Sequence, residues 1–285
     1  MKFKYHISQQ ETVKAFLARH DFSKKTVSAI KNNGALIVND EPVTVRKQLM
    51  PNDILEIHLP QEIPSVNLIP YARKLEVLYE DAFIIIVTKP NNQNCTPSRE
   101  HPHESLIEQV LYHCQDHGEN INPHIVTRLD RNTTGIVIFA KYGHIHHLFS
   151  KGNLKKIYTC LVYGKTHSSA GIIEANIRRS KDSIITREVA SDGKYAKTSY
   201  EVINQNDKYS LCKVHLHTGR THQIRVHFQH IGHPIVGDSL YDGFHDKIHG
   251  QVLQCTQIYF VHPINKNNIY ITIDYKQLLK LFNQL

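Results

Sequence analysis

The stretch HIVTRLDRNTTGIVIFAK, residues 124–141, places one aspartate between two arginines and directly before an apolar run. The run from Gly135 to Ala140 has the length and the branched side chains of a buried strand. Asp130 therefore lies beside the core, where an acidic side chain is rare unless it is paired. It is either a structural residue of a turn, with Asn132 and two threonines supplying turn chemistry, or a functional group. This stretch alone does not decide between the two interpretations.

The chemistry of this aspartate depends on its neighbours. A guanidinium close to a carboxylate favours the ionised form, and an ionised carboxylate can act as a nucleophile. A glycosidase would need a second carboxylate at a defined separation. Glu80 and Asp81 are acidic, but nothing in the sequence brings them near Asp130. The sequence therefore offers a candidate nucleophile without the partner that a glycosidase requires.

The composition favours a packed protein with an anionic partner. Of the 285 residues, 40% are hydrophobic, which is enough for a substantial core. The net charge is +8 with histidine neutral, a balance typical of nucleic-acid binding, although a merely soluble basic protein would share it. The five cysteines are widely spaced and form no C-x-x-C pair. They predict neither a disulfide framework nor a zinc site.

Reduced thiols fit a cytoplasmic protein. The first residues, MKFKYHISQQ, contain no apolar h-region, so we expect no signal peptide. The chain also lacks a run of about 18 apolar residues, so we expect no membrane span.

The sequence divides at a stretch that contains several prolines. We expect residues 1–62 to form a small α/β domain, residues 63–73 a linker, and residues 74–285 a larger domain. In the small domain, ETVKAFLARHDF and KKTVSAIKNN predict helices, and Ser23 is a suitable N-cap for the second. ALIVND and DILEIHLP predict short strands. The basic residues of this domain form either a solvated face or a phosphate-contacting surface; they are Lys24, Lys25, Lys31, Arg46 and Lys47.

The larger domain alternates strand patterns with loops and a few helices. ESLIEQVLYHCQDHG predicts a helix, and YKQLLKLFNQL predicts a closing amphipathic helix. The predicted strands are KIYTCLVYG, AKTSYEVIN, YSLCKVHLH and QVLQCTQIYFV. We expect an α+β fold built on a mainly antiparallel mixed sheet that helices and loops flank.

Two further stretches carry candidate functional groups. In HTGRTHQIRVHFQHIGHPIVGDSLYDG, residues 217–243, a strand and a helix opened by Thr221 are equally compatible with the pattern. Arg225 in this stretch could bind a carboxylate or a phosphate with two hydrogen bonds. Its histidines lack the H-E-x-x-H pattern and an acidic companion, which argues against a metal site. In KKIYTCLVYG, Tyr158 would either pack in the core or stack on a nucleobase.

Taken together and in this order, the three stretches resemble the RluA-type pseudouridine synthase family. HIVTRLDRNTTGIVIFAK is similar to the motif around its catalytic aspartate, and KIYTCLVYG to its K-x-Y-x-A-x-V-x-G strand. TGRTHQIRVHFQHIGHPIVGDSLY is similar to its T-G-R-T-H-Q-I-R-V-H segment and to the G-H-P-I-x-G-D-x-x-Y pattern that follows it. Thr127 and Thr134 depart from the His and Ser that are common in the first motif. The stretch from FSKKTVSAIKNNG to PNDILEI resembles, more weakly, the S-four-like RNA-binding domain that often precedes this catalytic domain.

The resemblance implies an isomerase that converts uridine to pseudouridine in structured RNA, without a cofactor or a metal. Asp130 would be the nucleophile and Arg225 its ion-pair partner. Tyr158 would stack on the base, and its hydroxyl would assist proton transfer at carbon 5. Arg128 would contact the RNA and fill the space that the extruded nucleotide leaves. The remaining substrate-binding residues would be Ile224, Arg220 and His222.

The resemblance favours ribosomal RNA as the substrate, with transfer RNA as the alternative, and a monomeric enzyme. The competing class is a non-catalytic RNA-binding protein, in which Asp130 would be dispensable. A zinc-dependent base deaminase would need H-x-E and P-C-x-x-C motifs, and the sequence contains neither.

Overall fold

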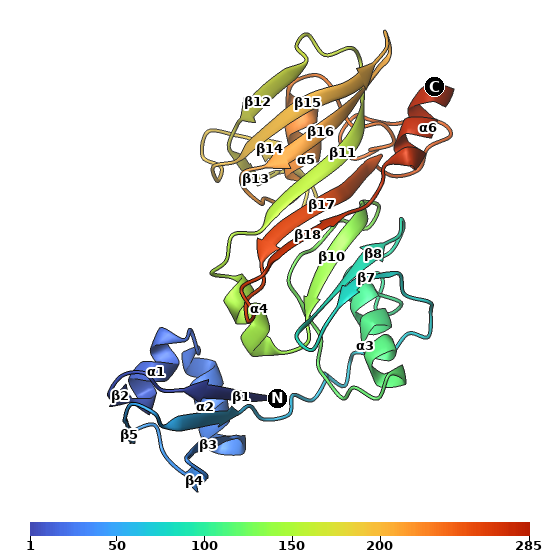
Figure 1. The fold of residues 1–285 in the computed structure, drawn as a ribbon. Coiled ribbons are helices and arrows are strands. Elements are labelled where there is room, and N and C mark those ends of the chain that lie inside the picture. The colour runs from blue at the N-terminus through green and yellow to red at the C-terminus, as the bar shows by residue number, and fades with distance from the viewer.

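The computed structural model describes all 285 residues, and it consists of a small N-terminal body and a larger one (Figure 1). The small body contains an antiparallel sheet in the order β1-β6-β3-β4. The strands of this body are β1 (Lys2–His6), β2 (Glu11–Thr12), β3 (Ala35–Val38), β4 (Glu41–Pro42), β5 (Gln48–Leu49) and β6 (Ile54–His58). Its helices are α1 (Val13–Arg19) and α2 (Lys24–Asn33). As the sequence predicts, the Ser23 hydroxyl caps α2 by accepting the Thr26 N–H at 3.1 Å.

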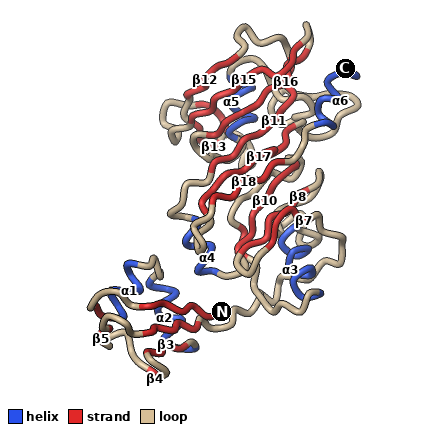
Figure 2. Tube along the Cα trace, in the orientation of Figure 1, coloured by secondary structure: helices blue, strands red, loops and turns tan.

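A single sheet of ten strands runs through the larger body (Figure 2). The main path of the sheet is β12-β15-β16-β11-β17-β10-β8-β7, with β18 beside β17 and β9 beside β10. Its strands are β7 (Val77–Glu80), β8 (Ile84–Lys89), β9 (His124–Ile125), β10 (Thr134–Ala140), β11 (Lys155–Tyr163), β12 (Ala170–Glu174), β15 (Lys197–Gln205), β16 (Tyr209–Leu216), β17 (Leu253–Val261) and β18 (Asn268–Thr272). A separate hairpin joins β13 (Ile177–Arg179) and β14 (Arg187–Val189). The helices are α3 (Leu106–Asp116), α4 (Gly143–Phe149), α5 (Gln223–His230) and α6 (Lys276–Gln284). None of the helices combines the length and the hydrophobicity that crossing a membrane requires.

The two halves of this sheet meet at one short parallel pairing. Every other strand pair is antiparallel, but β10 and β17 run parallel and pair only through Thr134 with Gln254 and Gly135 with Cys255. Gly135 has φ 107°, and a side chain at this position would collide with the Cys255 backbone. Glycine is therefore required where the loop that carries Asp130 enters the sheet.

Residues 223–230 form helix α5, so the strand alternative for this stretch is wrong. The helix starts after His222, whose φ of 56° is left-handed. Apolar and polar side chains alternate, yet all those from Gln223 to Phe228 are buried. A helix that is buried on every side shows no amphipathic periodicity, which explains why the pattern was ambiguous.

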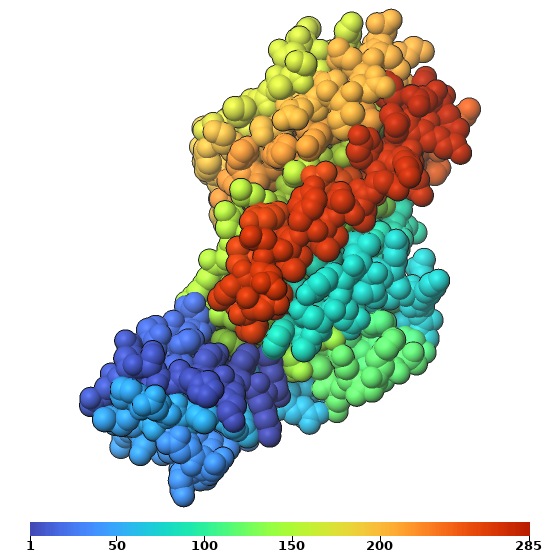
Figure 3. All heavy atoms as spheres, viewed as in Figure 1, coloured from blue at the N-terminus to red at the C-terminus, as the bar shows by residue number.

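The small body packs against α4 of the larger one (Figure 3). The buried His144 ring stacks on Phe22 at 4.2 Å between ring centroids and meets Phe3 edge-on. Lys151 forms an ion pair with Asp21 across the same contact at 2.6 Å. Residues 59–76 contain no helix or strand and connect the two bodies.

Candidate active site

A cavity of about 960 Å³ lies where β10 and β17 meet. Its walls come mainly from the segments 94–101 and 125–133, strand β11, and the turn 219–222 with the start of α5. Single residues complete the lining: Ile185, Leu216, Leu240, Gln251 and Leu253. The carboxylate of Asp130 is among the lining groups, and its side chain remains 31% exposed. A hollow of this size could hold a nucleotide-sized ligand.

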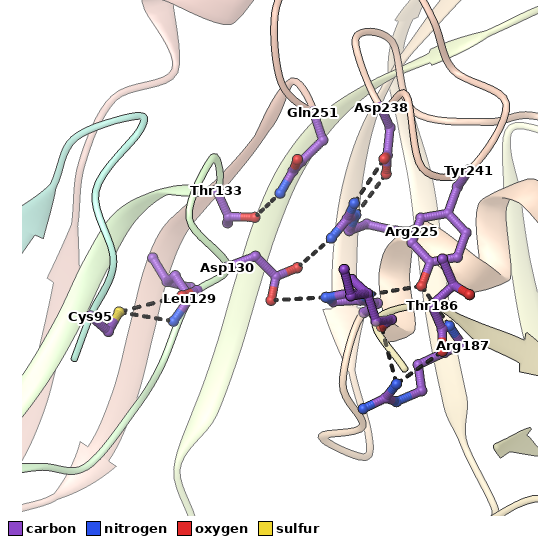
Figure 4. A network of polar contacts seen from close by, with 12 residues as sticks. Cys95, Leu129, Asp130, Thr133, Thr186, Arg187, Arg225, Asp238, Tyr241 and Gln251 are labelled. Carbon is purple, nitrogen blue, oxygen red and sulfur yellow. Dashed lines mark hydrogen bonds and ion pairs between the residues drawn. The ribbon is translucent and has the colours of Figure 1, made fainter. Parts of the chain in front are cut away.

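Asp130 forms an ion pair with a buried arginine that a second aspartate holds in place. Arg225 donates from Nη1 to Asp130 Oδ2 at 3.1 Å. It also donates from Nε and Nη2 to the two oxygens of Asp238, at 2.7 and 2.8 Å. Figure 4 shows the guanidinium between the two carboxylates, with the Tyr241 ring beside it. The centre of the guanidinium lies 4.8 Å from the centroid of that ring, within cation–π range.

The positive charge of Arg225 is shared unequally between Asp130 and Asp238. Burial lowers the pKa of Arg225, but the hydrogen bonds and charge of Asp238, together with Asp130, raise it above its ordinary value. The guanidinium therefore stays charged, and two carboxylates share one cation. Asp238 is 1% exposed and accepts two hydrogen bonds from the guanidinium, whereas Asp130 accepts one. The excess negative charge therefore faces the cavity on Asp130.

Side chains distant in sequence hold the loop that carries Asp130. Lys89 has no exposed surface and donates to the carbonyls of Pro90, Gln93 and Arg131 at 2.7 to 2.8 Å. Burial lowers the pKa of Lys89 to about 8, while three carbonyl acceptors solvate its ammonium form. The Cys95 thiol contacts the Leu129 N–H at 3.3 Å and the Leu129 carbonyl at 3.4 Å.

The far side of the loop is held by β17 and the segment before it. Gln251 Nε2 donates to Thr133 Oγ1 at 3.0 Å, and the Thr133 N–H donates to the Asp130 carbonyl at 3.0 Å. Asp130 therefore lies in a turn, as its sequence neighbours indicate, but the turn is fixed from both sides of the sheet junction. Rigid support of this kind is what a reacting group needs.

The sequence model for RNA pseudouridylate synthase matches residues 83–230, which include Asp130 and most of the cavity walls. The chain belongs to this family. YjbO of Bacillus subtilis, named as an uncharacterized RNA pseudouridine synthase, is 38% identical over 263 residues, which are 90% of this chain and 93% of YjbO. Ribosomal large subunit pseudouridine synthase D of Blochmanniella floridana is 33% identical over 220 residues, 74% of this chain and 68% of that protein.

A solved structure supports the fold. Human RNA Pseudouridylate Synthase Domain Containing 1 superposes with a TM-score of 0.59 at 20% identity, covering 79% of this chain and 98% of that one. The likeness confirms the predicted α+β fold with its mainly antiparallel sheet. By the family match, the protein is an RNA pseudouridine synthase, an isomerase that acts on RNA.

The remaining predicted catalytic residue, Tyr158, and the predicted substrate-binding residues line the same cavity. Tyr158 and Ile224 are 5% and 4% exposed, and both contribute to its wall. Burial, with the charges of Cys255 and Asp130 nearby, raises the pKa of Tyr158 well above its ordinary value, so its hydroxyl stays protonated. Arg128 and Arg220 are exposed at the wall.

His222 lies close to the Asp130 carboxylate. Its Nε2 atom is 3.8 Å from Asp130 Oδ1, on the opposite carboxylate oxygen from Arg225. By contrast, the predicted basic residues of the small body are exposed there, and none lines the cavity: Lys24, Lys25, Lys31, Arg46 and Lys47.

Five residues of the site were not predicted as members of it: Lys89, Cys95, Asp238, Tyr241 and Gln251. Asp238 and Tyr241 fall in the G-H-P-I-x-G-D-x-x-Y pattern, which is the one sequence signal that could have identified them.

Another buried cation that bridges two carboxylates lies at the far end of β10. Lys141 is 2% exposed and forms ion pairs with Glu80 at 2.8 Å and Glu119 at 2.7 Å. Cys114 lies beside these two carboxylates. The lysine ammonium bridges the two acidic groups, and none of these four residues lines the cavity.

Proposed function

We propose that this synthase isomerises specific uridines of ribosomal RNA, with Asp130 as the nucleophile. The observation that carries the proposal is the singly bonded Asp130 carboxylate, which the buried Arg225 holds at the wall of a nucleotide-sized cavity. The reaction breaks the bond between N1 and the sugar and forms a bond from the sugar to C5. N1 gains a proton and C5 loses one, so atoms balance without a cofactor.

The cavity has the groups that an extruded uridine requires. Flipping a nucleotide costs a few kcal/mol of unstacking, which contacts inside the pocket and at its mouth offset. Tyr158 offers a ring for stacking, and Ile224 closes the wall beside it. Arg128 is exposed next to Asp130, where a guanidinium can occupy the gap in the RNA stack and pair with a phosphate.

Arg225 has two roles in this proposal. Its charge stabilises the ionised Asp130 against the desolvation that bound RNA brings. Its two hydrogen bonds to Asp238 also fix the plane of the guanidinium. The third hydrogen bond, to Asp130, therefore orients that carboxylate toward the cavity. Aspartate pre-oriented by a rigid partner loses less entropy at the reacting step.

The small body supplies a separate RNA contact in this proposal. We assign residues 1–62 to an S-four-like RNA-binding domain, residues 63–73 to a linker and residues 74–285 to the catalytic domain. The exposed lysines of α2 and the loop before β5 suit phosphate binding without base readout. Ribosomal RNA is favoured over transfer RNA by the likeness to a protein named as a ribosomal large subunit synthase. We propose that one chain is sufficient for activity.

The test maps pseudouridine in total RNA from cells with and without the gene, by carbodiimide adducts and primer-extension stops. We expect stops in ribosomal RNA to vanish on deletion and to return with the wild-type gene but not with Asp130→Asn. Loss of stops in transfer RNA alone would show that the substrate is transfer RNA and not ribosomal RNA. Restoration by Asp130→Asn would overturn the nucleophile and favour a non-catalytic RNA-binding role.

A further inference from the structure

The environment of His222 indicates a more specific role than substrate contact. His222 occupies the position before α5 with a left-handed backbone, which is uncommon for residues other than glycine. This backbone turns its ring toward Asp130 on one side and Tyr241 on the other. Its Nε2 lies 3.8 Å from Asp130 Oδ1, and its Nδ1 lies 2.7 Å from the Tyr241 hydroxyl oxygen. The side chain is 12% exposed.

The hydrogen bonds around Tyr241 determine which ring nitrogen of His222 carries the proton. The Tyr241 oxygen accepts the Arg187 backbone N–H at 2.8 Å. Tyr241 is 2% exposed, so its own proton needs an acceptor inside the protein. His222 Nδ1 is the partner at hydrogen-bond distance, and it can accept only when it is unprotonated. The neutral ring therefore carries its proton on Nε2, the atom that faces Asp130.

We propose that His222 is a positioning residue for Asp130, and that Tyr241 fixes it as the neutral Nε2–H tautomer so that it donates to Asp130 Oδ1. This inference rests on the proposed nucleophile. Arg225 holds Oδ2 and His222 approaches Oδ1, so the two donors define the plane of the carboxylate from both oxygens. The gap of 3.8 Å exceeds a hydrogen bond and closes when RNA fills the cavity and removes competing water.

The groups that face His222 keep it neutral at physiological pH. Burial lowers its pKa, the negative charge of Asp130 opposes this shift, and the positive charge of Arg225 adds to it. Arg187 lowers it further and Asp238 raises it, with the net direction downward. A neutral donor orients Asp130 without neutralising it, which leaves the carboxylate nucleophilic.

Tyr241 is the shared support of both donors. Its ring lies beside the Arg225 guanidinium and its hydroxyl contacts His222. The Arg187 N–H that completes the hydroxyl's hydrogen bonds belongs to strand β14. The β13–β14 hairpin is thereby connected to the orientation of Asp130 through a single phenol.

The two amide replacements of histidine separate this role from general packing. In His222→Gln the side-chain amide reaches the place of Nε2 and can donate to Asp130. In His222→Asn the amide reaches the place of Nδ1 and keeps only the Tyr241 contact. His230→Gln, at an exposed histidine in the last position of α5, is the control.

The assay follows tritium release from RNA labelled with [5-³H]uridine in cells that lack the gene. We expect His222→Asn to lower the single-turnover rate about 10- to 100-fold, the range for a hydrogen bond to a charged group, with the half-saturating RNA concentration unchanged. His222→Gln should retain most of the rate, and His230→Gln all of it. Equal rates for His222→Asn and His222→Gln, or a loss only in RNA affinity, would overturn the proposal.

A second readout is independent of activity. Two-bond ¹H–¹⁵N correlation spectra of the ¹⁵N-histidine-labelled protein, with the His222 signals identified from the His222→Gln spectrum, report which nitrogen is protonated. We expect protonated Nε2 in the wild type, a mixed tautomer in Tyr241→Phe, and a shifted His222 signal in Asp130→Asn. A proton on Nδ1 would refute the positioning role even if Asp130 proves essential, whereas an inactive wild type with the expected spectra would refute only the proposed function.

Discussion

Arg225 and Lys141 are both buried cations that bridge two carboxylates, yet only Arg225 lines the cavity at the junction of β10 and β17. Their side chains are 5% and 2% exposed, and all their ion-pair distances fall between 2.7 and 3.1 Å. Burial and pairing therefore do not by themselves mark a functional site. Buried ion pairs are also weak evidence for stabilisation, because desolvation offsets much of the attraction.

The difference lies in where the paired carboxylates lie. Lys141 contacts one oxygen of Glu80 and both oxygens of Glu119 at 2.7 to 2.8 Å, and neither carboxylate lines the cavity. Arg225 gives two bonds to the fully buried Asp238 and one longer bond to the cavity-facing Asp130. Only the Arg225 group therefore presents a carboxylate to a substrate. The planar guanidinium also fixes the directions of both of its carboxylates, which an ammonium group, lacking a fork of fixed geometry, does not.

The largest expected effect is on the reaction rate, and it distinguishes the Asp130 carboxylate from the Glu119 carboxylate. Asp130→Asn should lower tritium release by at least about 10⁴-fold, because the amide is not a nucleophile. Glu119→Gln, the corresponding change at Lys141, should leave the rate unchanged. A rate for Asp130→Asn within tenfold of the wild type would remove the distinction between the two clusters.

The second effect concerns the cations. Arg225→Met and Lys141→Met each leave two carboxylates without their buried partner, so each should lower the free energy of unfolding by about 3 to 5 kcal/mol. The measurement is urea unfolding followed by circular dichroism. Only Arg225→Met should also abolish the activity of the molecules that remain folded. Full activity in folded Arg225→Met would mean that Asp130 needs no ion pair.

The smallest effect is a pH dependence confined to the Lys141 cluster. Burial raises the pKa of Glu80, but hydrogen bonds from Lys141 and His113 outweigh this and lower it below the ordinary 4.5. Stability from this interaction is therefore fully present above pH 4.5 and is lost as the pH falls through the pKa of the folded state. Glu80→Gln should flatten the decline of the urea midpoint below pH 4.5 and leave the rate at pH 7 unchanged. An unaltered decline would place the acid sensitivity elsewhere.

The sequence identified the parts of the site that lie within single motifs. Asp130 was recognisable because its flanking arginines and the following strand form one continuous pattern, and the G-R-T-H-Q-I-R stretch named Arg225. Lys89 and Cys95 were not recognisable, because their roles are backbone contacts to the Asp130 loop from another segment. Such contacts depend on the packing of β8 against β10, which no local pattern encodes.

Secondary structure followed the same rule. The amphipathic helix α6 and the capped helix α2 were predicted from periodicity and from Ser23, whereas α5 was ambiguous because burial on every side removes the periodic signal. The ion pair between Arg225 and Asp130 came from the family resemblance. Asp238 falls in a family pattern, but its two hydrogen bonds to Arg225 were visible only in three dimensions.

The parallel pairing of β10 with β17 at Gly135 and Cys255 affects when the enzyme becomes active during its synthesis. During translation, Asp130, Tyr158 and Arg225 leave the ribosome in this order. Strand β17, which pairs with β10 next to the Asp130 loop, leaves the exit tunnel long after Asp130. A nascent chain that stops before Gln251 also lacks the hydrogen bond to Thr133. Domains emerge and fold from the N-terminus onward, so catalytic competence arrives as a late event of translation. We therefore expect this RNA-modifying enzyme to be inactive while most of its chain is still being translated.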